Sequence, residues 1–224
     1  MTDMPDSATP TPAGTLPDAA DLAAQIAARL CHDFISPASA VVSGLDLLDD
    51  PNAQDMREDA MTLIRQSALK LADLLQFSRV AFGASASAEV FDSRELESLT
   101  RGIFAHVRPD VDWKVEPAGL NKPSARILLN LAQIAAGALP TGSLATIRVV
   151  EADGRVAINL DAVGPRARLK PEVLRGLRGE PRGDAVGGAW VQAYYLHLIV
   201  QGAGGQLAAE VGEDRVTLAA WIPA

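Results

Sequence analysis

The sequence predicts an α+β protein in which a long helical hairpin precedes a mixed domain, and three observations support this class. Apolar residues recur every three or four positions from Leu22 to Leu48 and again from Met56 to Leu75, which is the period of two long amphipathic helices. After residue 88, short apolar strands alternate with shorter helices. Hydrophobic residues make up 48% of the 224 residues and charged residues 21%, as in ordinary folded domains.

The first helix is expected to begin after Asp18, whose side chain can cap it, and to end near Asp49, before Asp50-Pro51. Its apolar stripe consists of Leu22, Ile26, Leu30, Phe34, Pro37, Val41, Leu45 and Leu48. At about 100° per residue, His32 lies roughly 200° from the centre of that stripe. We therefore expect His32 to face water.

A second helix is expected over residues 53–82, antiparallel to the first because the connection between them is short. Two helices cannot cover both of their wide apolar stripes, so the hairpin predicts a homodimer with a four-helix bundle. The alternative is that the second half of the same chain covers the stripe. The predicted organisation is a disordered, proline-rich tail at 1–17, the hairpin at 18–84 and a second domain at 85–224.

The second domain is predicted to be an α/β sandwich, with helices beside a mostly antiparallel sheet. The turn Asp153-Gly154 favours a tight β-hairpin. The expected strands are 89–92, 111–116, 146–151, 155–161, 206–211 and 215–222, and the expected helices are 93–106, 124–139 and 186–201.

Composition excludes several functions. A net charge of −8 argues against nucleic acid as a partner, because phosphate binding requires a basic surface. The single cysteine, Cys31, permits no internal disulfide and has no metal-ligand set around it. No apolar run reaches the roughly 18 residues of a membrane span, and no leader pattern is present. We expect a cytoplasmic protein without a cofactor or metal of its own.

Residues 32–37 read His-Asp-Phe-Ile-Ser-Pro, which resembles the phosphoacceptor box of histidine kinase dimerisation domains. Such a histidine attacks phosphorus with one ring nitrogen. Asp33 can accept a hydrogen bond from the other nitrogen, which fixes the tautomer and stabilises the developing positive charge. Ser36 lies one helical turn further on and keeps the approach small and polar. We therefore expect His32, Asp33 and Ser36 to carry the chemistry.

Residues 85–224 resemble the ATP-binding domain of those kinases, but the nucleotide-binding positions are altered. In the register of the resemblance, Ile134 replaces a magnesium-binding asparagine, Val163 and Pro165 replace glycines of the adenine loop, and Trp190 and Gln192 replace glycines around the phosphates. Side chains at glycine positions obstruct close approach of a ligand to the backbone. We expect no ATP binding and no autophosphorylation.

A phosphoacceptor helix beside a domain without an ATP site resembles the ChpT family of histidine phosphotransferases. The resemblance implies a dimer that relays phosphate from the receiver domain of a CckA-like hybrid histidine kinase to CtrA-like and CpdR-like response regulators. It also implies that each receiver supplies the Mg²⁺ for transfer. Two alternatives stay open: an active sensor kinase core with an unusual nucleotide site, and an adaptor that docks receivers without catalysis.

Two surfaces are candidates for receiver binding. On the first helix, Ile35 and Val42 flank the histidine face and can provide an apolar anchor, while Ser39 and Ser43 leave room for receiver loops. The alternative is that Ile35 and Val42 pack against the second helix. Cations of the segment 161–182 form the second surface, which suits acidic receivers unless it is simply solvated. Its candidate contacts are Arg166, Arg168 and Lys170.

Overall fold

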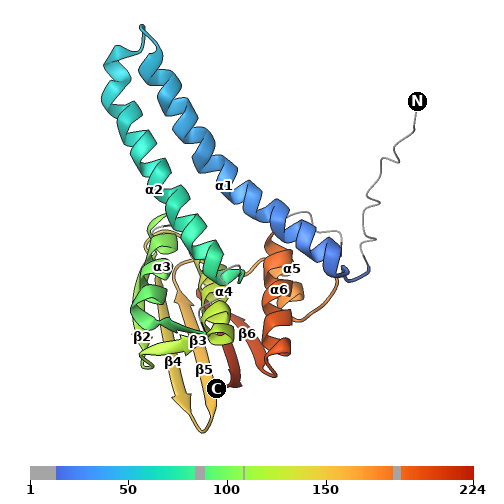
Figure 1. Ribbon diagram of the computed structural model, residues 1–224. Coiled ribbons are helices and arrows are strands. Elements are labelled where there is room, and N and C mark those ends of the chain that lie inside the picture. Colours follow the sequence, from blue (N-terminus) through green and yellow to red (C-terminus); the bar gives the residue numbers. More distant parts are fainter. Residues whose placement is uncertain (1–13, 84–88, 108, 184–187) are drawn as a thin grey trace, which may run out of the picture.

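The computed structural model describes residues 14–83, 89–107, 109–183 and 188–224, and it shows a long helical hairpin projecting from an α/β unit (Figure 1). The hairpin consists of α1 (Ala19–Asp49) and α2 (Arg57–Ala81), joined through the short 3-10 helix η1 (Gln54–Met56). The predicted α+β class is confirmed. The predicted tail lies largely in residues 1–13, and the predicted domain boundary in 84–88; both fall outside the described residues.

The ends of α1 follow from its capping residues. The Asp18 carboxylate accepts a hydrogen bond from the backbone N–H of Asp21 at 2.8 Å, and α1 ends at Asp49 as predicted. Near the tip of the hairpin the two helices approach each other at Gly44. A Cβ added there would lie 2.6 Å from Cγ1 of Ile64 and 3.2 Å from the carbonyl oxygen of Ala60. A glycine is therefore what allows this close approach.

The second unit is built on a five-stranded sheet with the order β2-β4-β5-β7-β6. Strands β2 and β4 are parallel, and the other neighbours are antiparallel. The predicted turn at Asp153-Gly154 is present, with φ angles of 52° and 69°. The strands are β2 (Asp110–Val115), β4 (Leu144–Ala152), β5 (Arg155–Val163), β6 (Gln206–Gly212) and β7 (Arg215–Pro223).

Helices α3 (Ser93–Ala105), α4 (Lys122–Ala138) and α6 (Ala189–Gly202) pack beside this sheet (Figure 1). The core is formed by α4 against the inward side chains of β4 and β5; Leu128, Leu131, Ile147 and Ile158 are completely buried. Strand β1 (Val90–Asp92) corresponds to the predicted strand at 89–92. The short strand β3 (Gly119–Asn121), which pairs with β1, and helix α5 (Pro171–Leu177), which lies within the cationic segment, were not predicted.

The lower end of α2 belongs to the core of the second unit. Phe77 and Ala81 are completely buried in the same apolar cluster as the sheet. Asn130 of α4 donates its side-chain N–H to the carbonyl oxygen of Ala81 at 2.9 Å, and Nε2 of His106 lies 2.9 Å from an Asp73 carboxylate oxygen. The hairpin is thus anchored in the α/β unit.

Much of the apolar surface of the hairpin stays exposed in the single chain. Leu45, Met61 and Leu75 are each nearly half exposed, and Leu69 is 59% exposed. The α/β unit packs on the start of the α1 stripe, at Leu22 and Ile26. The alternative of complete coverage within one chain is therefore wrong, and the dimeric bundle stays a prediction. No helix in the described part of the chain is long and apolar enough to cross a membrane.

Candidate functional site

His32 projects from α1 into open space, with 88% of its side chain exposed. Pro37, five positions later, is buried. Ser36, Ser39 and Ser43 are exposed like His32. The expected outward orientation of the imidazole is therefore present, and no large side chain of α1 covers it.

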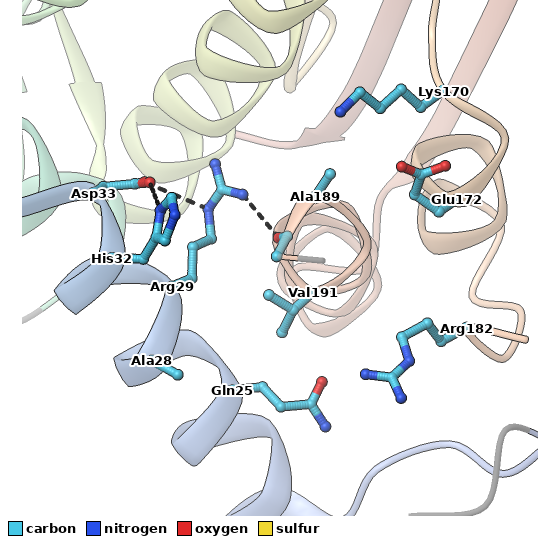
Figure 2. Close-up of a pocket in the computed structure, with 11 residues that line it drawn as sticks. Gln25, Ala28, Arg29, His32, Asp33, Lys170, Glu172, Arg182, Ala189 and Val191 are labelled. Carbon is cyan, nitrogen blue, oxygen red and sulfur yellow. Dashed lines mark hydrogen bonds and ion pairs between the residues drawn. The ribbon is translucent and has the colours of Figure 1, made fainter. Parts of the chain in front are cut away.

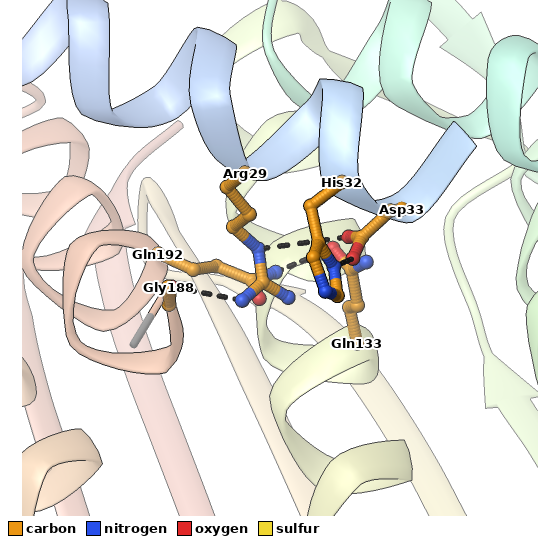
Figure 3. Close-up of polar contacts among 6 residues, drawn as sticks. All are labelled: Arg29, His32, Asp33, Gln133, Gly188 and Gln192. Atoms are coloured by element: carbon orange, nitrogen blue, oxygen red, sulfur yellow. Dashed lines mark hydrogen bonds and ion pairs between the residues drawn. The ribbon is translucent and has the colours of Figure 1, made fainter. Parts of the chain in front are cut away.

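A chain of polar contacts runs from His32 to the second unit (Figure 3). Nδ1 of His32 lies 3.4 Å from Oδ1 of Asp33, and Oδ2 of Asp33 lies 3.8 Å from Nε of Arg29. Arg29 donates a hydrogen bond of 2.8 Å to the carbonyl oxygen of Gly188, which precedes α6. Because a carboxylate only accepts, the Asp33 contact favours a proton on Nδ1 and a lone pair on Nε2 of His32.

His32 also borders a pocket of about 520 Å³ between α1 and the second unit (Figure 2). The α1 wall includes Gln25, Ala28 and Arg29. The opposite wall comes from α6 and from the segment around α5, which contributes charged side chains. Three cations and two carboxylates border the space: Arg29, Lys170, Arg182, Asp33 and Glu172. The pocket therefore joins the histidine to residues distant in the sequence.

Trp190 holds α6 against α1. Its side chain is 1% exposed and packs with Tyr194 and Val191 against Leu22 and Ile26 of α1. The Trp190 and Tyr194 rings stack with centroids 4.8 Å apart, and the indole N–H donates to the carbonyl oxygen of Glu180 at 3.0 Å. A side chain at a position where the resemblance expects glycine thus fixes the two units together.

Two other residues that replace the expected nucleotide-binding residues are also buried inside the protein. Ile134 is 6% exposed. Gln192 is 3% exposed and donates a hydrogen bond to the side-chain oxygen of Gln133 (Figure 3). A smaller pocket of about 230 Å³ remains beside them, bordered in part by Arg168 and Lys170.

Asp161, the aspartate of the former adenine loop, is bound by strand β7. Its Oδ1 accepts hydrogen bonds from Arg215 at 2.8 Å and from Thr217 at 2.9 Å. Burial raises the pKa of Asp161, but these hydrogen bonds and the charge of Arg215 outweigh it, so the pKa lies below its usual value. The carboxylate is therefore ionised and engaged within the sheet at neutral pH.

The predicted cationic contacts lie on one extended segment. Arg166, Arg168 and Lys170 are exposed, whereas Ala167 and Leu169 between them are buried, so the three cations share the outer face. Lys170 borders the His32 pocket, Arg168 borders only the smaller pocket, and Arg166 borders neither. Lys170 is therefore the one of the three that lines the His32 pocket, and the role of all three in receiver binding stays a prediction.

On α1, Ile35 and Val42 are 62% and 57% exposed. The alternative that they pack against α2 is therefore wrong.

Arg29 and Arg182 line the site but were not among the predicted functional residues. The i,i+4 spacing of Arg29 and Asp33 was a usable signal for an ion pair. No group of three or more His, Cys, Asp or Glu side chains within the described residues is placed to hold a metal ion.

Comparison with known proteins gives concordant matches. Residues 93–215 match the family described as the histidine phosphotransferase C-terminal domain. The chain is 32% identical over 203 residues to the protein phosphotransferase ChpT of Brucella abortus (strain 2308), covering 90% of this chain and 96% of that protein. A solved structure of a bacterial phosphotransferase superposes with a TM-score of 0.82 at 29% identity, covering 92% of this chain and 98% of the other.

Replacing Trp190 by Ala should lower the free energy of unfolding by about 3–5 kcal/mol, because the change removes a buried aromatic ring and leaves a cavity between α6 and α1. Urea denaturation followed by circular dichroism measures this. Trp221→Ala is the matched control, since Trp221 is only partly buried in β7. Equal losses in the two variants would show that Trp190 does not hold the units together.

Proposed function

Because the chain belongs to the ChpT family of histidine phosphotransferases, we propose that it relays a phosphoryl group between receiver-domain aspartates through a phosphohistidine at His32. The observation that supports this most strongly is the exposed imidazole with its Nδ1 facing Asp33 and a pocket beside it. An exposed nucleophile suits a macromolecular phosphodonor, which has to bring its own phosphoaspartate to the ring.

In the proposed step, the lone pair on Nε2 of His32 attacks the phosphorus of a receiver phosphoaspartate. The nitrogen–phosphorus bond forms as the phosphorus–oxygen bond to the receiver aspartate breaks, and the bonding pair leaves with that carboxylate. The imidazole keeps the proton on Nδ1 and becomes positively charged. Asp33 stabilises that charge through its contact with Nδ1. The reverse sequence delivers the phosphoryl group to a second receiver.

The receiver supplies the remaining charge stabilisation. We expect Mg²⁺ to arrive bound to the receiver's own acidic residues, where it offsets charge on the transferring phosphoryl group. His32 and its neighbours then provide a nucleophile held at a defined position, which is the main contribution a protein surface can make to such a transfer. The exposed Ser36 leaves the in-line approach to the ring open.

Receivers are proposed to dock over α1 and across the pocket. Ile35 and Val42 offer exposed apolar side chains. The small side chains of Ser39 and Ser43 leave space on the same helix for the loops of a receiver. Lys170 faces this region from the opposite wall, with Arg168 and Arg166 further along the same face. Positive charge there favours acidic receiver surfaces and accelerates their association. We propose a CckA-like receiver as donor and CtrA-like and CpdR-like regulators as acceptors.

The active form is proposed to be a homodimer. On α2, Met61, Ala68 and Leu75 are exposed and recur every seven residues, the spacing of an apolar seam between paired helices. Pairing two hairpins along this seam would give a four-helix bundle and cover the apolar side chains of the hairpin that are exposed in the single chain. His32 lies on α1, away from the α2 seam, and would stay accessible.

Incubation with a phosphorylated receiver should transfer label to the protein, and ATP alone should transfer none. His32→Ala should abolish labelling, whereas Asp33→Asn should slow it by about 10- to 100-fold, as loss of a histidine-orienting partner does elsewhere. Cys31→Ser, at the exposed neighbouring position, is the control and should transfer normally. Labelling from ATP would support a kinase, and normal receiver regulation by His32→Ala would support an adaptor.

Lys170→Glu should weaken receiver binding by roughly tenfold, or about 1.4 kcal/mol, because it puts a negative charge opposite acidic partners. Transfer kinetics at increasing receiver concentration would show this as a raised KM that depends on salt. Lys114→Glu, on the edge strand β2, should leave KM unchanged. An unchanged KM in Lys170→Glu would remove this lysine from the docking surface.

Light scattering should give twice the chain mass for the wild-type protein. The double substitution Met61→Arg and Leu75→Arg should give a monomer, because it puts two like charges into the proposed seam. Val90→Arg, at another exposed apolar position on β1, should stay dimeric. A monomeric wild-type protein, or a dimer of the double variant, would contradict the proposed seam.

A further inference from the structure

We propose that Arg29 is a positioning residue for phosphotransfer, which keeps Asp33 turned toward Nδ1 of His32 by tying that carboxylate to helix α6. The proposal rests on the proposed function of His32. Arg29 does not touch the reacting atoms in this scheme; it acts through Asp33.

The geometry of Arg29 joins two elements that are 159 residues apart in sequence. Nε of its guanidinium lies 3.8 Å from an Asp33 carboxylate oxygen. Another guanidinium nitrogen donates a hydrogen bond of 2.8 Å to the carbonyl oxygen of Gly188 (Figure 3). Its side chain is only 18% exposed. The planar guanidinium can satisfy both directions at once, which a lysine ammonium on a flexible stem cannot match.

The position of Asp33 depends on this partner. Among the described residues, Arg29 is the arginine or lysine that pairs with this carboxylate, and burial weakens the screening of their attraction by water. Burial lowers the pKa of Arg29 and the Asp33 charge partly offsets this; the guanidinium stays protonated. Without it, no arginine or lysine in the described part of the chain would hold Asp33 in place before the ring becomes positively charged.

The contact between Arg29 and Asp33 also has room to shorten. Nε of Arg29 is buried and has no hydrogen-bond partner, because 3.8 Å to Asp33 is too long for one. Hydrogen bonds at catalytic sites are often long in the free protein and shorten in the reacting complex. A small movement of Asp33 toward Nε would satisfy this buried N–H while Asp33 still faces the imidazole.

A purely structural role predicts something different. If Arg29 only fastened α1 to α6, its loss would lower stability, and any effect on transfer would be independent of Asp33. If it acts through Asp33, its loss should have little further effect once Asp33 has been replaced. A double-mutant cycle separates these cases, since coupled residues are non-additive.

The first experiment measures single-turnover transfer from a saturating phosphorylated receiver to wild type, Arg29→Met, Asp33→Asn and the double variant. Arg29→Met should lower the rate constant by about tenfold, Arg29→Lys should restore part of it, and the double variant should match Asp33→Asn. Arg101→Met is the control, because Arg101 also contacts a carboxylate four residues earlier, Glu97, and a backbone carbonyl, at Val111. It should transfer normally. Additive losses, or an unchanged rate in Arg29→Met, would overturn the proposal.

The second experiment needs no transfer and therefore separates this proposal from the function of His32. Nitrogen-15 NMR of the histidine rings reports which nitrogen carries the proton, and His32→Ala assigns the signals among the three histidines. The wild-type ring should carry its proton on Nδ1, and Arg29→Met should shift the population toward Nε2–H. If the Arg29→Met variant unfolds, the tautomer of His32 is measured in Arg29→Lys instead. An unchanged tautomer in both Arg29 variants would contradict the positioning role.

Discussion

The packing of α6 on α1 is the contact on which the arrangement of the site depends. Trp190 and Tyr194 lie against Leu22 and Ile26, and Arg29 adds a hydrogen bond to Gly188 beside them. At the other end, the last turns of α2 are buried in the core of the α/β unit. Two attachments on different helices set the angle between the hairpin and the α/β unit. That angle places the wall containing Lys170 across the pocket from His32.

The same contact gives a physical account of the altered nucleotide positions. At positions where the kinase resemblance expects glycine, Trp190 and Gln192 supply buried side chains that pack or form hydrogen bonds inside the protein. Burial of an aromatic ring stabilises the fold, whereas a glycine would leave room for a ligand. Asp161 is likewise engaged with Arg215 and Thr217. The α/β unit packs against α1 through these side chains, an arrangement that suits the proposed arrival of the phosphoryl group on another protein.

The site is correspondingly incomplete by itself. It offers an exposed imidazole, a carboxylate that faces Nδ1 of that ring, and a charged wall, and the proposed receiver would bring the phosphorus, the metal ion and the second reacting oxygen. High exposure of His32 is therefore a requirement of this chemistry, because both reactants are macromolecules. The exposed apolar side chains on α1 and α2 fit the proposed dimer and receiver contacts, because a surface that binds another chain has to stay uncovered within its own.

The sequence by itself determined the two long helices, most of the strands, the Asp153-Gly154 turn and the outward direction of His32. These depend on periodicity and on turn and capping residues within a few positions, which local backbone geometry decides. The three-residue strand β3 and the seven-residue α5 are too short to show a clear period. Only the tertiary structure decided that Arg29 reaches Gly188 and that Lys170, rather than Arg166, borders the pocket. Both contacts depend on how α6 packs against α1, through side chains more than 150 residues apart in the sequence. No local sequence pattern carries information over that separation.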